Sequence, residues 1–403
     1  MKAVGVVVEY NPFHNGHHYH VQKSKQITES DIVIAVMSGS FLQRGEPALI
    51  NKWARTRMAL QNGVDLVIEL PYIYSTQHAK IFAEGAVSLL EALRCDYFCF
   101  GSENGTIQQF RQAYRIMQEK KEALDDAIRS FSKQGFNYPT AVSKAWGQIA
   151  PSEENSIDLS KPNNILGYQY IAAALNNHYR ITPALINRIG AQYHDEKLPE
   201  GQIASATSIR KSIMDSNGDN SQTKAFMPEA SFEELTSHIH TFHELHHWEL
   251  YWPLLQYMLL VSSPEHLRTI YEVEEGIEYR LKEAAQTSGS FASFISFVKT
   301  KRYTLTRLQR ICVHILTQTK KDEMNRLMHS PAYLRILGFN QKGRMYMNEK
   351  KKQFELPLIS KIGSAAYEAL ALDVKAAKVH SLPLPPAGQQ QLFKREYQQP
   401  VIM

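Results

Sequence analysis

The sequence predicts an α/β fold, with a Rossmann-like parallel sheet in its first half and a mainly helical region after it. Three observations lead to this prediction. The apolar runs of the first half are continuous rather than alternating, as in strands that are buried on both faces. Stretches with helical spacing separate these runs. Several runs also end in Gly, Ser or Asn, which is typical of the turns where such sheets bind ligands.

The expected strands and helices of the first half follow in order along the chain. Strands are expected at residues 4–8, 32–37, 65–70 and 97–100, and helices at 52–61 and 79–93. The second strand leads into Ser38-Gly39-Ser40, and the fourth into Gly101-Ser102-Glu103-Asn104-Gly105. Because the carboxyl ends of parallel strands share one sheet edge, these turns predict a ligand crevice along that edge.

The second half is expected to consist mainly of helices. Helical patterns occupy residues 232–239, 254–261, 270–285 and 305–316, with few strand signals between them. A polar, turn-forming stretch at 216–222 separates the two regions. We therefore expect an α/β domain at 1–215 and a basic, mainly helical domain at 224–380. Three prolines followed by glutamines predict a weakly ordered tail at 381–403.

The composition is that of an ordinary soluble protein, with 43% hydrophobic and 21% charged residues. The longest apolar stretch, residues 252–261, is too short to span a bilayer, and the N-terminus has no signal-peptide pattern. The three cysteines form no even framework, and Cys95 and Cys99 are expected in the core around a buried strand. These features predict a cytoplasmic protein without a membrane segment.

A histidine-rich turn follows the first expected strand. His14-Asn15-Gly16-His17 has the pattern H-x-G-H and lies between the run 4–8 and a helix start. The N–H groups of a helix start attract anions, and two imidazoles can point at the same anion. The helix start and the two imidazoles together suit a nucleotide phosphate whose negative charge grows during a displacement reaction. The alternative interpretation is a surface turn that happens to be rich in histidine. The chain has neither G-x-G-x-x-G nor G-x-x-x-x-G-K-[ST], which disfavours dinucleotide and P-loop sites.

The segment 301–352 is strongly basic, with 13 Lys or Arg against three acidic residues. Aromatic residues lie between these cations, so the segment could hold phosphates and stack on unpaired bases. A solvated helix face with core aromatics is the alternative. We favour nucleic-acid binding, with candidate contacts at Lys301, Arg302, Arg307, Arg310, Lys342 and Arg344.

The segment His243-Glu244-Leu245-His246-His247 matches the zinc-protease pattern H-E-x-x-H. The pattern arises easily in a chain with 16 histidines, and nothing in the sequence fixes a third ligand. An exposed amphipathic helix is therefore the favoured interpretation, and no metal site is predicted.

Seven longer strings carry a family resemblance. They are VVEYNPFHNGHHYH, MSGSFLQRGEPA, KWARTRMAL, LPYIYSTQHAKIFAEGAV, FGSENG, KPNNILGYQY and ASATSIRKSI. Together with the H-x-G-H turn they resemble the bacterial tRNA(Met) cytidine acetate ligase family of the nucleotidylyltransferase superfamily, up to about residue 350. The late superfamily motif, similar to I-S-S-T-x-I-R, is divergent here because Ala206 stands where a second serine is usual.

The resemblance implies a ligase that converts acetate and ATP to acetyl-adenylate. It then acetylates the wobble cytidine of elongator tRNA(Met) to N4-acetylcytidine. ATP is a substrate, and Mg²⁺ is expected to accompany it, held largely by phosphates and water. No protein partner is implied.

The implied site centres on the H-x-G-H turn. His14 and His17 are the expected catalytic residues at the α-phosphate. Ser205, Thr207 and Ser208 would open a late helix that receives the outgoing phosphates. Arg210 would add a planar cation, unless it pairs with a structural carboxylate. Further ATP contacts are implied at Val7, Val8, Glu9, Tyr10, Asn11, Pro12, Phe13, Asn15, Gly16, His18, Tyr19, His20, Gly101, Asn163 and Arg188.

Two other functions remain open. One is a small-molecule nucleotidylyltransferase that makes a nucleotide cofactor, but such enzymes are generally compact and the basic helical half would be unexplained. The other is a non-catalytic scaffold that binds ATP or RNA, which would not need both histidines of the turn.

Overall fold

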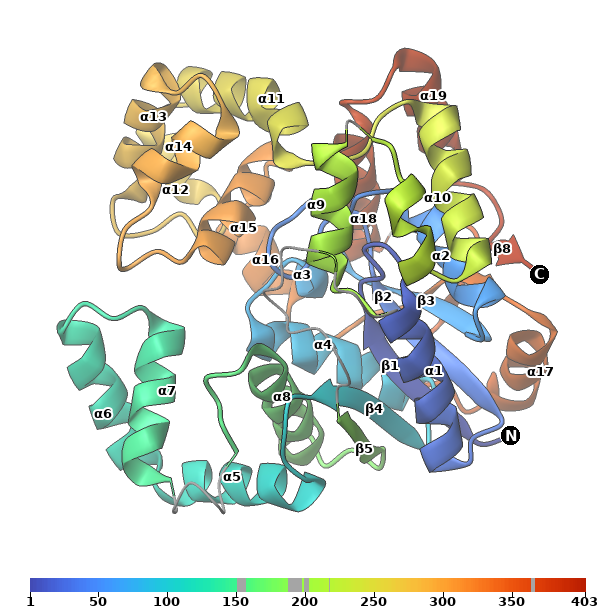
Figure 1. Ribbon diagram of the computed structural model, residues 1–403. Coiled ribbons are helices and arrows are strands. Elements are labelled where there is room, and N and C mark those ends of the chain that lie inside the picture. The colour runs from blue at the N-terminus through green and yellow to red at the C-terminus, as the bar shows by residue number, and fades with distance from the viewer. Residues whose placement is uncertain (151–156, 188–197, 199–202, 217, 364–366) are drawn as a thin grey trace.

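One central sheet organises the chain (Figure 1). The computed structural model describes residues 1–403 except 151–156, 188–197, 199–202, 217 and 364–366. The sheet has the strand order β5-β4-β1-β2-β3-β6-β7, and β8 pairs with β6. The strands are β1 (Ala3–Val8), β2 (Ile32–Ser38), β3 (Leu66–Leu70), β4 (Tyr97–Ser102), β5 (Thr182–Asn187), β6 (Leu334–Phe339), β7 (Leu358–Ile359) and β8 (Val401–Ile402).

The first five strands form the predicted parallel sheet. β1 pairs in parallel with β2 and β4, β2 with β3, and β4 with β5. Side chains of β2 alternate between two cores, with Ile32 and Ile34 in one and Val33 and Ala35 in the other. Both cores are buried, which explains why the strand sequences are continuously apolar.

Helices cover both faces of this sheet. α4 and α8 pack together with the first core, whereas α1 and α2 contribute to the second. The predicted helix at 52–61 is confirmed as α2, whose N-cap Asn51 accepts the Trp53 and Ala54 N–H groups. The helices of the first half are α1 (Asn15–Thr28), α2 (Lys52–Gln61), α3 (Tyr72–Ser75), α4 (Ala79–Ala92), α5 (Ile107–Glu119), α6 (Lys121–Lys133), α7 (Tyr138–Ile149), α8 (Pro162–Asn176) and α9 (Ala206–Asp215).

The second half is mainly helical. It begins with the 3₁₀ helix η2 (Ser221–Phe226). Its α-helices are α10 (Glu229–Phe242), α11 (Trp248–Val261), α12 (Pro264–Thr269), α13 (Ile277–Thr287), α14 (Phe291–Val298), α15 (Leu305–Leu316), α16 (Lys321–Leu327), α17 (Gln341–Lys350), α18 (Glu368–Ser381) and α19 (Pro386–Arg395). The helix expected at 270–285 is wrong over its first turns, because Glu272 and Glu275 adopt positive φ values of 62° and 58° and α13 starts only at Ile277.

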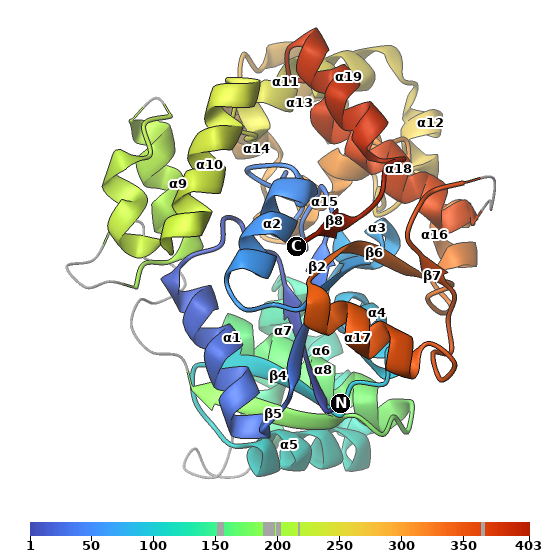
Figure 2. The same ribbon diagram turned by 90° about the vertical axis from the view of Figure 1, so that its right-hand side faces the viewer.

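The second half also completes the central sheet, which the sequence did not predict. β6 runs antiparallel to β3, with Leu66 opposite Phe339, and β8 runs parallel to β6. α17, which follows β6, lies beside the N-terminus of the chain (Figure 2), where the Met1 amino group pairs with Glu349 at 2.7 Å. The α/β and helical regions therefore share one sheet.

The prediction of a weakly ordered tail is wrong. Residues 381–403 contain α19 and β8, and Glu396 after α19 is buried. Its carboxylate pairs with Lys52 at 2.9 Å and Arg335 at 2.8 Å, and it accepts the Trp53 indole N–H at 3.1 Å. These distant partners hold the tail against α2 and β6, so local composition did not decide its order.

The cysteines beside and within the fourth strand lie where the sequence predicts them. Cys95 and Cys99 are buried, as predicted, and burial raises the pKa of the Cys99 thiol to about 12. Within the described residues, no helix is long and apolar enough to cross a membrane.

Candidate active site

The turn between β1 and α1 places two histidine rings side by side. His14 is the N-cap of α1, and its Nδ1 accepts the Gly16 N–H at 3.0 Å. The Nδ1 of His17 accepts the His14 N–H at 3.3 Å. The two ring centroids are 3.8 Å apart. The two imidazoles thus form a capping box, in which a helix start is stabilised by reciprocal side-chain acceptors.

These bonds determine which nitrogen is protonated in each neutral ring. A nitrogen that accepts a hydrogen bond is the unprotonated one, so neutral His14 and His17 carry their proton on Nε2. Both residues line a cavity at the end of β1. Each can therefore donate an Nε2–H hydrogen bond to an anion there, while the N-terminus of α1 adds its own positive potential.

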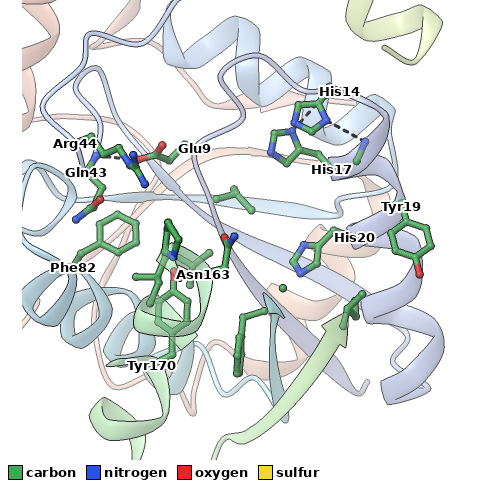
Figure 3. A pocket seen from close by; sticks show the side chains of 18 of the residues that line it. Glu9, His14, His17, Tyr19, His20, Gln43, Arg44, Phe82, Asn163 and Tyr170 are labelled. Carbon is green, nitrogen blue, oxygen red and sulfur yellow. Dashed lines mark hydrogen bonds between the residues drawn. The ribbon is translucent and has the colours of Figure 1, made fainter. Parts of the chain in front are cut away.

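The cavity has a volume of about 300 Å³ and lies at the carboxyl ends of β1, β4 and β5 (Figure 3). This is the sheet edge at which the sequence predicted a ligand crevice. Ten of the expected ATP contacts line it: Val7, Val8, Glu9, His14, Gly16, His17, Tyr19, His20, Gly101 and Asn163.

Other residues of the first predicted stretch support the turn instead of lining the cavity. Tyr10, with a positive φ of 48°, and Phe13 are buried in the second core, and Pro12 is buried as well. Asn11 Oδ1 accepts the Leu49 N–H at 2.7 Å, which ties the turn to the segment before α2. Asn15 donates to the Ala225 carbonyl, and His18 lies on α1 beside Gln22.

The late motif forms a helix start, as predicted, beside the same cavity. Ser205 is the N-cap of α9 and accepts the Ser208 N–H at 3.0 Å, while the Ser208 hydroxyl donates to the Ser205 carbonyl. Ile203 and Ala204 just before this cap line the cavity, whereas Ser205, Thr207 and Ser208 do not. Arg188 lies outside the described residues.

Arg210 makes the structural pairing that the sequence left open. Its guanidinium donates to the Asn11 carbonyl at 2.9 Å and to the Glu46 carboxylate at 3.1 Å. It does not line the cavity. The arginine thus joins α9 to the histidine turn and to the loop after β2.

Sequence reasoning missed the cavity residues that come from neighbouring elements. Gln43 and Arg44 come from the loop after β2, Phe82 from α4 and Tyr170 from α8. They occur in strings that carry the family resemblance, and the loop after β2 ends at the ligand edge of the sheet. That position was the signal by which Gln43 and Arg44 could have been found.

The predicted tRNA-binding residues do not form one surface. Lys301 and Arg302 are exposed before α15, and Arg307 is partly exposed with a 3.3 Å ion pair to Glu274. Arg310 is buried, and its guanidinium donates to the Glu272 carboxylate through two nitrogen atoms. The prediction that Arg310 contacts tRNA at the surface is therefore wrong. Lys342 and Arg344 are exposed on α17, beside the N-terminus of the chain.

Several residues of the basic segment belong to the core, in line with the alternative interpretation. Tyr303, Tyr333 and Tyr346 are buried, and Arg335 is buried between Glu69 and Glu396. The count of 13 cations therefore overstates the charge that the segment presents to solvent.

The H-E-x-x-H segment is not a helix. His243 ends α10 with a positive φ of 58°, and α11 begins only at Trp248. His246 is buried, and its Nδ1 lies 2.7 Å from the Tyr251 hydroxyl. The predicted amphipathic helix is therefore wrong here. Within the described residues, no group of three or more His, Cys, Asp or Glu side chains could hold a metal ion.

Comparisons with known proteins show the family to which the chain belongs. The family model of the HIGH nucleotidyl transferases matches residues 1–396. The tRNA(Met) cytidine acetate ligase of Bacillus subtilis is 50% identical over 95% of this chain and 93% of its own length. The protein of the same name from Lysinibacillus sphaericus is 45% identical over the full length of both chains.

Solved structures are similar to this chain over its whole length. Apo TmcAL of Thermotoga maritima has a TM-score of 0.92 and 33% identity, and the match covers both chains completely. The crystal structure of that protein with alpha-thio ATP has a TM-score of 0.90, 32% identity and the same coverage. With the paired histidines and the parallel sheet, these similarities show that the chain belongs to the tRNA(Met) cytidine acetate ligase family of HIGH nucleotidyl transferases.

Proposed function

We propose that this protein activates acetate with ATP and transfers the acetyl group to the wobble cytidine of elongator tRNA(Met), giving N4-acetylcytidine. The observation that carries the proposal is the pair of imidazoles at the start of α1, which line the cavity and accept backbone N–H groups on Nδ1. The names of the full-length relatives support the choice of acetate and tRNA(Met).

The first step is an in-line displacement at the α-phosphorus of ATP. An acetate oxygen forms a bond to phosphorus, and the bond to the oxygen that bridges to the β-phosphate breaks, so pyrophosphate leaves with the electron pair. Negative charge grows on the phosphate oxygens, and Nε2–H bonds from His14 and His17 stabilise it. No covalent intermediate with the protein is needed.

Mg²⁺ is part of this proposal as the companion of ATP. Glu9 is the single carboxylate among the described residues that line the cavity. Such a site suits an ion whose ligands are mostly phosphate oxygens and water. When bound, the ion would neutralise phosphate charge.

The tRNA is proposed to lie across the start of α15. Lys301 and Arg302 are exposed there and can contact backbone phosphates. α15 also packs on the loop that carries Gln43 and Arg44, because a Cβ on Gly45 would lie 2.3 Å from the Arg310 backbone nitrogen. A tRNA held at α15 would therefore be close to the cavity. Binding by Lys342 and Arg344 on α17 remains a separate prediction.

ATP–pyrophosphate exchange tests the chemistry. Purified protein is assayed with a panel of small carboxylates, mononucleotides and phosphopantetheine, with and without tRNA(Met). We expect exchange that depends on acetate, and AMP release with N4-acetylcytidine only when tRNA is added. Exchange driven by a nucleotide or phosphopantetheine would favour the cofactor-making alternative. Acetylation that requires acetyl-coenzyme A and releases no AMP would refute the proposal.

A further inference from the structure

The cavity has two chemically different ends. Figure 3 shows His14 and His17 on one side, and Glu9, Gln43 and Arg44 grouped on the other. A triphosphate is favoured at the histidine end, where the helix start and the Nε2–H donors attract anions. At the opposite end the Glu9 carboxylate, which lies beside the Arg44 guanidinium, can accept hydrogen bonds from a group that carries N–H donors.

Glu9 is fixed through both its backbone and its side chain. Arg55 Nη1 donates to the Glu9 carbonyl at 2.7 Å, and the Gln43 N–H donates to Glu9 Oε1 at 2.8 Å. None of the described residues donates a hydrogen bond to Glu9 Oε2. One oxygen is therefore anchored, and the other has no hydrogen-bond donor among the described residues.

Transfer of an acetyl group to an aromatic amine requires a proton acceptor. The lone pair of the cytosine amine is delocalised into the ring, so attack on the acetyl carbon proceeds only as an N–H proton is removed. His14 and His17 cannot take that proton in their neutral form, because Nδ1 already accepts a backbone N–H and Nε2 is protonated. The fixed carboxylate of Glu9 can take it.

Building on the function proposed above, we propose that the Glu9 end of the cavity receives the acceptor cytosine and that Glu9 Oε2 takes the proton from its exocyclic amine. The amine nitrogen forms a bond to the acetyl carbon, and the carbonyl π electrons move to oxygen. The amine proton passes to Oε2. When the carbonyl re-forms, the bond from the acetyl carbon to the phosphate oxygen breaks, and AMP leaves with that electron pair.

The surroundings of Glu9 favour this role. Burial raises the pKa of the Glu9 carboxyl, and it outweighs the Gln43 N–H bond, which lowers it. Glu46 raises this pKa further, whereas Arg44 and Arg210 lower it. A raised pKa makes the carboxylate a stronger base. The other titratable groups that interact with it are Arg55 of α2 and Tyr170 of α8, and the histidines that line the same cavity are His14, His17 and His20.

The test separates the two half-reactions in Glu9→Gln, Glu9→Asp and the wild type. Adenylation is followed by acetate-dependent pyrophosphate exchange. Transfer is followed in a single turnover, by adding tRNA(Met) to enzyme preloaded with ATP and labelled acetate, from acid to alkaline pH. Glu84→Gln is the matched control, because Glu84 lies on α4 outside the cavity in a 4.0 Å ion pair with Lys80.

We expect Glu9→Gln to slow transfer about 100-fold or more beyond any effect on adenylation, the scale of a lost general base. Wild-type transfer should fall in acid with one ionisation, and this fall should be absent in Glu9→Gln and kept in Glu9→Asp. A purely structural role for Glu9 would not remove the acid limb of the pH profile.

Three results would overturn the proposal. The first is a wild-type rate of acetyl transfer in Glu9→Gln, and the second is an acid limb of the pH profile that persists in that variant. The third is loss of the acid limb in His20→Gln instead of in Glu9→Gln. If Glu9→Gln does not fold, the proposal is overturned when the wild-type transfer rate does not fall in acid, or when that fall is absent in Glu9→Asp. Absence of acetate-dependent exchange in the wild type would instead refute the function on which the proposal rests.

Discussion

We propose two roles for His14, as a helix cap and as a donor to the α-phosphate, and two substitutions separate them. As the N-cap of α1 it accepts the Gly16 N–H on Nδ1, and it also lines the cavity, where its proposed role is to donate Nε2–H to an anion. Asparagine is among the best N-cap residues but has no donor at the position of Nε2. His14→Asn therefore removes the catalytic donor and keeps the cap, whereas His14→Ala removes both.

The magnitudes follow from these contacts. Loss of one preorganised donor at a developing charge costs about 3 kcal/mol, or roughly 10²–10³ in rate. Loss of the cap costs about 1 kcal/mol of unfolding free energy. We expect both variants to lose acetate-dependent pyrophosphate exchange by a similar factor. Only His14→Ala should also be less stable, by about 1 kcal/mol.

The assay pairs steady-state pyrophosphate exchange with urea unfolding of the same preparations. His17→Ala, which removes the second donor, should lose exchange to a similar extent. Wild-type exchange in His14→Asn, with a loss only in the less stable His14→Ala, would mean that His14 serves solely as a helix cap. The assignment of the H-x-G-H turn as catalytic would then be refuted.

Two further predictions concern the second half of the chain. Reversing Lys301 and Arg302 together should weaken tRNA(Met) binding and lower its salt slope by about one unit per lost phosphate contact, and pyrophosphate exchange should be retained; an unchanged salt slope would place the tRNA elsewhere. Burial raises the pKa of Glu396, but Lys52 and Arg335 outweigh it and hold that pKa below its ordinary value of 4.5. The ion pairs of Glu396 with Lys52 and Arg335 therefore stabilise the fold at neutral pH. This contribution is lost as the pH falls through the folded-state pKa of Glu396. Glu396→Gln should cost about 3–5 kcal/mol at neutral pH and weaken the acid dependence of urea unfolding, and an unchanged unfolding free energy would contradict the tail's anchoring role.

Local sequence patterns were enough to predict the parallel core and the location of the histidine turn. Continuous apolar runs, helical spacing and turn residues are local signals, so β1 to β4 and α2 lie where the patterns predict them. The H-x-G-H turn was recognisable for the same reason, because its capping bonds involve residues only two or three positions apart.

The long-range pairings become visible only in the folded chain. The order of residues 381–403 depends on Glu396 meeting Lys52 and Arg335, and the burial of Arg310 depends on Glu272. β6 looks like part of a basic helical segment until β3 supplies its pairing partner. Likewise, Glu9 becomes a candidate base only once Gln43 anchors one of its oxygens and the fold places Glu9 in the lining of the cavity. Each of these features depends on charge or hydrogen-bond partners more than 30 positions away, which no local pattern encodes.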